Sequence, residues 1–228
     1  MSEDLEVYLR VREREGRIYS DDVLRQLPEV PAGHPLSAEW QARAASCRRL
    51  LGYFGSAQKP LTILEVGCGN GWLSNRLASV LRGVVVGVDR ESPELRQATR
   101  VFADRDELAW VAADIFHGGF SKDSFDAVVI ASAIQYFPEV PRLIQALLGI
   151  LKKDGEIHIL DSPFYAAEEL SAARERSRSY YERLGFPEMA AYYHHHSAAV
   201  LKAYNAVWLY RPVPQLRDSP FPWIRLRP

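Results

Sequence analysis

The chain has 228 residues, of which 47% are hydrophobic and 25% are charged. These values exclude a disordered or fibrous protein, and the length is typical of one domain with elaborations. Positive and negative side chains nearly cancel, with a formal net charge of -1 at pH 7, so no global field attracts a polyanion and bulk nucleic-acid binding is disfavoured.

The first residues and the two cysteines indicate the cellular compartment of the protein. The first residues alternate charges without the apolar stretch of a signal sequence, and no segment reaches the roughly 18 apolar residues of a membrane span. Two cysteines, Cys47 and Cys68, form no disulfide framework. We therefore expect a cytoplasmic protein, a monomer or homodimer, with neither a membrane nor a nucleic acid as partner.

Residues 1–55 are predicted to form a charged helical segment. It is interrupted at LPEVPAGHP, where prolines and a glycine exclude a regular helix. A further helix is predicted from Ser37 to about Tyr53, because its apolar residues recur at intervals of three or four. We expect this helix either to pack on a flank of the core or to close over a ligand site.

From Pro60 onward, short apolar runs alternate with helical segments. Strands are predicted at residues 61–66, 83–88, 108–113, 125–132 and 155–160, and helices at 70–81, 92–102 and 141–152. The strand runs are too uniformly apolar for a sheet with one face in water, so both faces are expected to be buried. This alternation predicts a doubly wound, mostly parallel α/β sheet with right-handed crossovers.

After the fifth strand the alternation stops. A long helix is predicted from about Ala166 to Leu184, and a shorter helix begins near Ser197. Two runs rich in aromatic and branched residues, AVWLYR and FPWIRLR, predict a closing hairpin at 206–227, which brings the sheet to seven strands.

We therefore expect a single domain over residues 1–228. Its parts are an N-terminal helical cap at 1–55, a core at 60–163, a helical insertion after strand five at 164–196, and a closing helix and β-hairpin at 197–228.

Three glycines stand between the first predicted strand and the helix that follows it, in ILEVGCGNGWLSNRL. Gly67, Gly69 and Gly71 allow positive φ angles in a tight turn and let a ligand approach the backbone where the amides of a helix N-terminus are free. The position of this loop is the one that a phosphate- or cofactor-binding loop requires.

The residues around these glycines narrow the choice of ligand. A loop for a nucleoside triphosphate needs a lysine after its last glycine, and none is present. A dinucleotide loop needs a small residue at position 72, where Trp72 stands. The carboxylate of Glu65, just before the loop, disfavours a pyrophosphate and favours a ligand with positive charge.

Two further carboxylates end predicted strands. Asp89 ends the second strand, roughly 20 residues after Gly67, where an acid can accept the hydroxyls of a ribose. Asp114 ends the third strand. The alternative for a single aspartate at a strand end is a cap on a helix or turn.

The motif E-x-G-x-G-x-G that begins at Glu65, together with the two aspartates, resembles the class I S-adenosylmethionine-dependent methyltransferases, and the whole chain is similar to uncharacterised bacterial methyltransferase-domain proteins. The resemblance implies the Rossmann-like methyltransferase fold and S-adenosylmethionine as cofactor. In the resemblance, Asp89 accepts the ribose hydroxyls, Asp114 and the Ile115 amide hold the adenine, and Ala131 and Ser132 lie beside the methionine part. The full set of cofactor-binding residues that it implies is Glu65, Gly67, Cys68, Gly69, Asp89, Arg90, Asp114, Ile115 and Ala131.

On the acceptor side, the resemblance implies that Gln135 and Tyr136 face the substrate. The run AYYHHHS places three histidines in succession, which cannot readily share one ion, so no metal is expected. We predict His195, the middle histidine, as a catalytic base together with Tyr136, because an imidazole can take a proton at neutral pH. Surface or capping histidines are the alternative.

We therefore predict an enzyme that methylates a small-molecule acceptor on an undetermined O, N or C atom. Two alternatives remain open: a non-catalytic protein that binds S-adenosylmethionine or S-adenosylhomocysteine, and a protein or RNA methyltransferase. The near-zero net charge weakens the RNA alternative.

Overall fold

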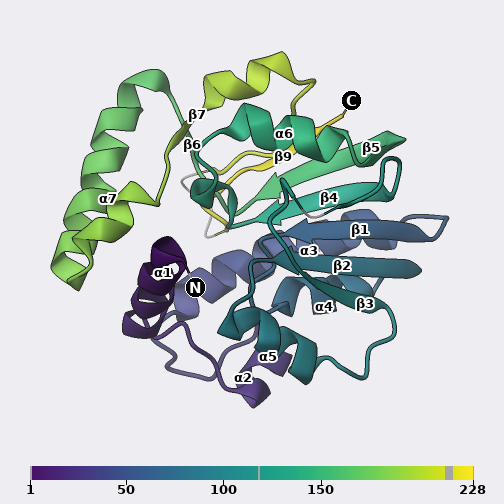
Figure 1. Cartoon of the computed structure of the whole chain (residues 1–228), viewed down its shortest axis with the longest axis horizontal. Coiled ribbons are helices and arrows are strands. Elements are labelled where there is room, and N and C mark those ends of the chain that lie inside the picture. Colours follow the sequence, from purple (N-terminus) through teal and green to yellow (C-terminus); the bar gives the residue numbers. More distant parts are fainter. Residues whose placement is uncertain (1, 118, 214–217, 228) are drawn as a thin grey trace.

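A seven-stranded sheet forms the centre of the computed structural model, which describes residues 2–117, 119–213 and 218–227 (Figure 1). The strands lie in the order β3-β2-β1-β4-β5-β9-β8. The first five strands in sequence pair in parallel, whereas β9 is antiparallel to both β5 and β8. The bounds are β1 Leu61–Val66, β2 Gly83–Asp89, β3 Leu108–Ala112, β4 Phe125–Ala131, β5 Leu151–Leu160, β8 Val207–Tyr210 and β9 Trp223–Leu226. The predicted fold class, including the closing hairpin, is confirmed.

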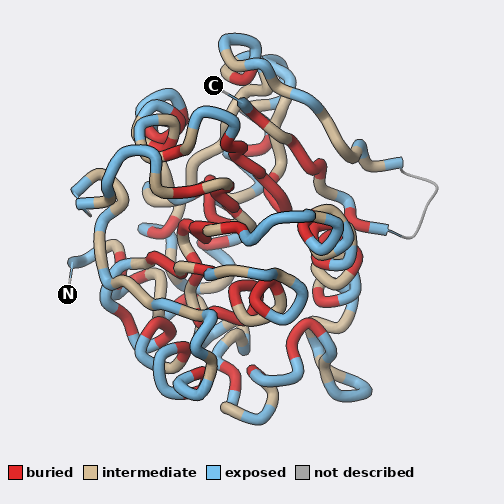
Figure 2. The backbone as a smooth tube through the Cα atoms, turned by 90° about the vertical axis from the view of Figure 1, so that its right-hand side faces the viewer, coloured by how far each residue is buried: buried red, intermediate tan, exposed pale blue. Residues whose placement is uncertain are grey.

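Helices cover both faces of this sheet. The helices are α1 Glu3–Arg14, α2 Asp21–Gln26, α3 Ser37–Gly55, α4 Trp72–Ala78, α5 Pro93–Val101, α6 Val140–Leu148 and α7 Leu170–Leu184, with short 3-10 helices η1 Ile134–Tyr136, η2 Ala167–Glu169, η3 Pro187–Ala191 and η4 Ala198–Ala203. Buried side chains of α3 and α4 pack on one face, and those of α6 and η4 pack on the other. Figure 2 shows the buried residues concentrated along the central strands.

The third helix of the core ends earlier than predicted. The sequence indicated a helix at 141–152, but α6 ends at Leu148 and β5 begins at Leu151. Leu151 is buried and pairs with Phe125 at the start of β4, and a register shift follows in this pairing. The helix therefore ends before Leu151 because this residue pairs with a neighbouring strand. Helical spacing in the sequence cannot reveal such a pairing.

The segment at 164–196 begins and ends in a separate two-stranded sheet. Two short parallel strands, β6 (Phe164–Tyr165) and β7 (His196–Ser197), pair with each other at its base. The helix that was predicted from about Ala166 is divided, because η2 precedes α7 and α7 begins only at Leu170. The pairing of β6 with β7 was not predicted, since two residues carry no recognisable strand pattern.

Segments that are far apart in sequence meet beside this insertion. Val7 and Val11 of α1 pack with Tyr181 of α7 and Met189 of η3 in a small buried cluster. The N-terminal helix and the insertion therefore lie side by side near the carboxyl ends of the strands (Figure 1). None of the helices in the described ranges combines the length and the apolarity that a bilayer-spanning segment needs.

Candidate functional site

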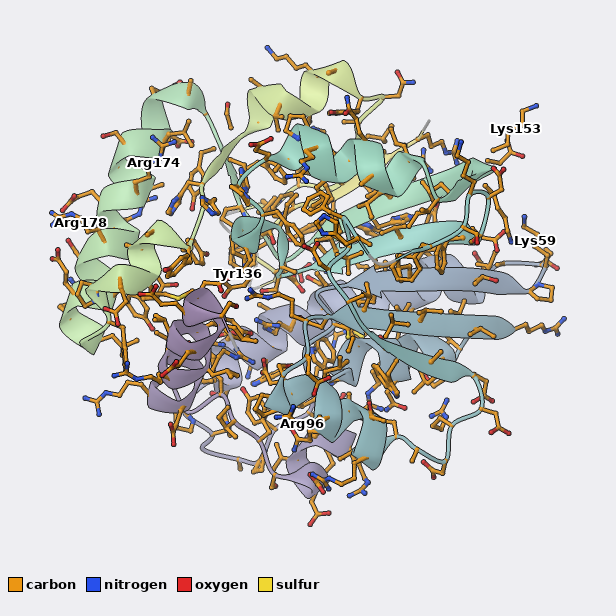
Figure 3. The ribbon with its side chains drawn as sticks, viewed as in Figure 1. Lys59, Arg96, Tyr136, Lys153, Arg174 and Arg178 are labelled. Atoms are coloured by element: carbon orange, nitrogen blue, oxygen red, sulfur yellow. The ribbon has the colours of Figure 1, made fainter. Side chains whose placement is uncertain are left out.

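A cavity of about 1770 Å³ opens at the carboxyl ends of β1, β4 and β5. Open parallel sheets bind ligands at this end of their strands. Residues of α1, α3 and α7 complete the walls of the cavity. The volume exceeds the roughly 300–1,000 Å³ of common ligand pockets, so the cavity has room for two molecules at once. Figure 3 places Tyr136 between α7 and these strand ends, whereas Lys59 and Lys153 lie at the opposite end of the sheet.

The glycine loop lines this cavity and has the backbone that only glycines adopt easily. Gly67 and Gly71 have φ values of 72° and 74°. A Cβ atom added to Gly67 would lie 2.6 Å from the Cβ atom of Ala133, and one added to Gly71 would overlap the Trp110 ring. Gly71 is therefore the small residue that allows the close contact between helix and strand. The next residue, Trp72, begins α4 and packs on Trp40.

Glu65 is a buried carboxyl group at the floor of the cavity. The hydroxyl of Ser74 donates a hydrogen bond to it, and no cationic side chain of the described residues pairs with it. Burial, with a smaller contribution from the nearby carboxylate of Asp89, raises the pKa of Glu65 to about 8. The site therefore holds a carboxyl group that lacks a partner cation.

Asp89 ends β2, as predicted, and holds the glycine loop. Its two carboxylate oxygens accept backbone N–H groups from Gly69 and Arg90, each at 2.7 Å. Burial raises the pKa of Asp89, although both of these hydrogen bonds lower it. The side chain of Asp89 is not among the residues that line the cavity, but it lies directly behind the loop that does.

Three other predicted cofactor residues do not line the cavity. The side chain of Arg90 points to α1, where it pairs with Asp4 at 2.5 Å. Asp114 is exposed and accepts the N–H of Phe116 at 2.9 Å, the turn-capping arrangement that was the alternative for a strand-end aspartate. Ile115 packs against the core on the α6 side of the sheet.

Ala131 and Ser132, both expected beside the methionine part, line the cavity, whereas sequence reasoning missed Asp161 and the unusual backbone that it shares with Ser132. Ser132 and Asp161 follow β4 and β5, and both have positive φ values, 56° and 51°. Such values are unusual for residues other than glycine and are found at functional sites. Arg43 of α3 donates to the Ser132 hydroxyl at 3.1 Å, and Ser46 of α3 donates to Asp161 at 2.6 Å.

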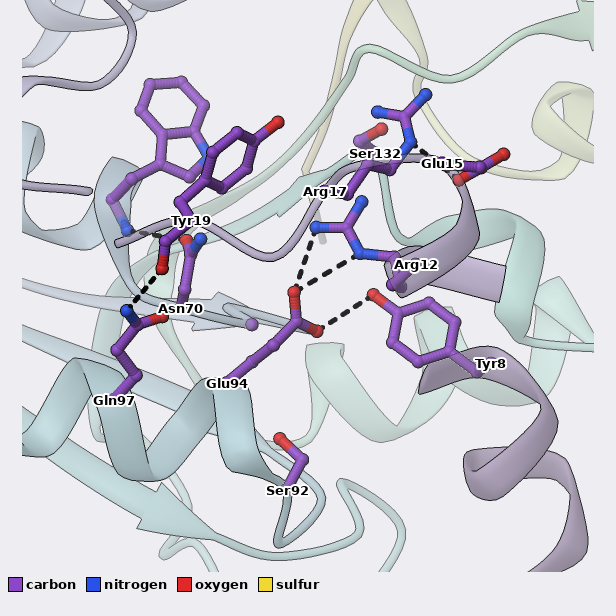
Figure 4. A network of polar contacts seen from close by, with 12 residues as sticks. Tyr8, Arg12, Glu15, Arg17, Tyr19, Asn70, Ser92, Glu94, Gln97 and Ser132 are labelled. Atoms are coloured by element: carbon purple, nitrogen blue, oxygen red, sulfur yellow. Dashed lines mark hydrogen bonds and ion pairs between the residues drawn. The ribbon is translucent and has the colours of Figure 1, made fainter. Parts of the chain in front are cut away.

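A second missed feature joins α1 to the start of α5 (Figure 4). The buried carboxylate of Glu94 accepts hydrogen bonds from Tyr8 at 3.2 Å and from the guanidinium of Arg12 at 2.9 and 3.3 Å. Tyr8 and Arg12 are four residues apart and therefore share one helix face. That spacing is the only signal in the sequence, and it does not identify Glu94.

Tyrosines form part of the wall of the cavity. The ring of Tyr136 lies 5.3 Å from that of Tyr8 and 6.0 Å from that of Tyr193, centroid to centroid and edge to face. Tyr181 lies 5.9 Å beyond Tyr193. Tyr136, predicted to face the acceptor, is thus part of a continuous aromatic surface.

The three consecutive histidines contact different parts of the structure. His195 does not line the cavity, and its Nε2 atom lies 2.9 Å from the hydroxyl of Ser177, which does line it. Burial, together with the charge of Arg174, lowers the pKa of His195 and so favours the neutral imidazole. His194 donates its backbone N–H to Gln135, and Nε2 of His196 lies 3.1 Å from the carbonyl of Ile134. Within the described residues, no group of three or more potential metal ligands is present.

Comparison with known proteins adds to this geometry. The family described as "Methyltransferase domain" matches residues 64–159. An uncharacterized methyltransferase of Mycobacterium bovis is 33% identical over 98 residues, which are 43% of this chain and 49% of the relative. A 2-phytyl-1,4-naphtoquinone methyltransferase of Nostoc punctiforme is 31% identical over 113 residues, or 47% of this chain and 49% of that protein. The chain thus spans about half the length of the curated relatives it matches.

The same architecture occurs in solved structures. The geranyl diphosphate C-methyltransferase of Streptomyces coelicolor, solved with S-adenosyl-L-homocysteine, superposes with a TM-score of 0.58 at 13% identity, over 86% of this chain and 84% of that one. At this identity the likeness concerns the fold. Residues 64–159 thus match a methyltransferase domain, and the strand order and the glycine loop agree with the Rossmann-like methyltransferase fold of these structures.

Proposed function

We propose that this protein transfers a methyl group from S-adenosylmethionine to a small-molecule acceptor. The observation that carries the proposal is that a glycine loop opens on the same cavity as an aromatic wall, with a buried carboxyl group, Glu65, that has no cationic partner among the described residues. The 2-phytyl-1,4-naphtoquinone methyltransferase that it resembles in sequence and the geranyl diphosphate C-methyltransferase that it resembles in fold are both named for small-molecule acceptors.

The residues around the glycine loop fit this cofactor. Gly67 leaves space that a Cβ atom would fill, and Glu65 offers a negative charge to a cationic group. Asp89 would accept the ribose hydroxyls in exchange for part of its backbone contacts, and Ala131 would lie beside the methionine part. Cys68 and Gly69, which line the cavity, would contact the cofactor as well. Arg90 and Asp114 would reach it once their side chains turn, and Ile115 would contribute its backbone amide.

When bound there, S-adenosylmethionine supplies a methyl group that its sulfonium has already activated. The protein has then mainly to hold the acceptor in line with that methyl group and to exclude water, which can contribute about 7–11 kcal/mol. Tyr136 would form one face of the acceptor site. For an acceptor hydroxyl, the proton would pass to the Ser177 oxygen while the Ser177 proton passes to Nε2 of His195, since the two atoms are 2.9 Å apart.

Isothermal titration with S-adenosylmethionine, S-adenosylhomocysteine and NADH tests the cofactor assignment. We expect binding of the first two, and a loss of about 1.5–3 kcal/mol in Asp89→Ala, the range for hydrogen bonds to a charged group. Asp22→Ala, an exposed carboxylate on α2, is the matched control. Equal affinity of wild type and Asp89→Ala, or a preference for NADH, would refute the assignment. Methyl transfer from labelled cofactor into a small-molecule extract separates an enzyme from a binding protein.

A further inference from the structure

Some of the charged side chains that line the cavity form ion pairs and others do not. Four of its arginines form ion pairs with four of its carboxylates: Arg12 with Glu94, Arg17 with Glu15 and Glu39, Arg43 with Glu39, and Arg49 with Asp218. The two other lining arginines, Arg48 and Arg176, have no carboxylate partner among the described residues. The two remaining lining carboxyl groups, Glu65 and Asp161, accept serine hydroxyls, and burial raises the pKa of each, which works against their ionisation. Within the described part of the chain, two cations of the lining, Arg48 and Arg176, therefore lack the carboxylate partner that the other four arginines have.

Arg176 lies on the acceptor side of this cavity. Helix α7 turns a stripe of residues toward the cavity, spaced three and four apart as one helix face requires: Ala173, Arg176, Ser177, Tyr180 and Tyr181. The guanidinium of Arg176 lies beside Tyr165, where it partly offsets the rise that burial causes in the pKa of that hydroxyl. Arg176 therefore places an unpaired cation next to the tyrosine wall and to Ser177.

The bound cofactor would not neutralise both of these arginines. The carboxylate and ammonium of S-adenosylmethionine cancel, so its sulfonium adds one positive charge, which an ionised Glu65 would balance. The single carboxylate of the cofactor can pair with at most one of Arg48 and Arg176, so at least one of them would keep no counter-charge and would repel a cationic acceptor. A guanidinium is well suited to a carboxylate because it can donate two parallel hydrogen bonds.

We propose that the acceptor is an anionic aromatic compound whose acidic group is bound by Arg176 and whose ring packs against Tyr136 and Tyr193. Aromatic rings at centroid separations of roughly 4.5–7 Å attract one another, and the spacing within the wall falls in this range. The proposal rests on the proposed function, whose acceptor class it specifies. Its central prediction, however, is anion binding, which can be measured without methyl transfer.

The test compares ring compounds of similar shape and different charge. Binding of 4-hydroxybenzoate, 4-hydroxybenzamide and tyramine is measured by ligand-observed NMR, with and without the cationic cofactor analogue sinefungin, and phenyl phosphate is added to distinguish a carboxylate site from a phosphate site. We expect the dissociation constant of 4-hydroxybenzoate to be about 10- to 100-fold lower than that of the amide. Tyramine should bind more weakly than either.

Two variants on α7 assign the effect. Arg176→Gln should remove the preference for the anion, whereas Arg174→Gln should keep it, because Arg174 is an exposed arginine of the same helix that does not line the cavity (Figure 3). Circular dichroism and cofactor affinity confirm that both variants are folded and intact at the cofactor site. Equal binding of acid and amide, tighter binding of tyramine, an unchanged preference in Arg176→Gln, or no binding of any anionic probe at millimolar concentration would overturn the proposal. If the anion binds but S-adenosylmethionine does not, the proposed function fails and the anion site stands.

Discussion

Glu65 is subject to opposing demands from stability and binding. Its burial raises the pKa of the carboxyl group to about 8, so the folded protein holds a proton that the unfolded chain releases near pH 4.5. Between these two values the folded state binds more protons than the unfolded state, and the stability that this group contributes falls as the pH rises. A cation in the cavity would reverse that loss, because it favours the ionised form.

We therefore predict that Glu65→Gln stabilises the empty protein at pH 7 and weakens cofactor binding. Glutamine can still accept the Ser74 hydroxyl but never has to ionise, so the free energy of unfolding should increase, on the order of 1–3 kcal/mol. Denaturant unfolding and isothermal titration measure the two effects. Glu91→Gln, at an exposed position on the same rim, should change neither. A variant that is destabilised, or that binds S-adenosylmethionine as tightly as wild type, would contradict this role.

At the scale of elements, α1 is attached to the core largely through polar contacts. Arg12 and Tyr8 bind the buried carboxylate of Glu94, and Asp4 pairs with Arg90 after β2. A buried carboxylate that loses its cation is costly, and breaking such a pair can cost about 3–5 kcal/mol. The position of α1 over the cavity therefore depends on the Arg12–Glu94 pair.

We predict that Arg12→Gln increases hydrogen exchange in α1 by at least about tenfold. Exchange in η3 should rise with it, because Val7 and Val11 pack against Met189 of that helix. Arg14→Gln, an exposed arginine of the same helix, is the control and should leave exchange unchanged. In the double variant with Glu94→Gln, protection should partly return, since no unpaired charge is then buried. Equal exchange in all four proteins would show that apolar packing alone holds α1.

At the scale of the whole molecule, the closing hairpin is joined to the parallel sheet by a buried polar network. His158 of β5 is fully buried, accepts the indole N–H of Trp223 at 3.1 Å and contacts Glu156 at 3.0 Å. Burial lowers the pKa of His158 and outweighs the effect of Glu156, which raises it. Below pH 6.5 the unfolded chain thus takes up a proton that the folded protein excludes. The free energy of unfolding therefore decreases as the pH decreases.

We predict that this one histidine accounts for a distinct part of the acid sensitivity. As the pH falls through 6.5, the wild type should lose up to about 1.4 kcal/mol per pH unit more than His158→Gln. Calorimetric unfolding between pH 7.5 and pH 5 measures the difference, and His117→Gln, at an exposed position, serves as reference. Parallel stability curves for wild type and His158→Gln would show that His158 does not couple folding to pH.

The sequence by itself determined the elements whose signals are local. Apolar runs of strand length, helical spacing and the E-x-G-x-G-x-G motif identified the parallel sheet, the closing hairpin and the glycine loop, because each depends on residues within a few positions of one another. The same locality placed Asp89 at the end of β2. Tertiary structure decided the contacts between distant segments: the binding of Glu94 by Arg12, the turn of His195 toward Ser177, and the start of β5 beside β4. These depend on which surfaces the fold brings together, and no spacing along the chain encodes that.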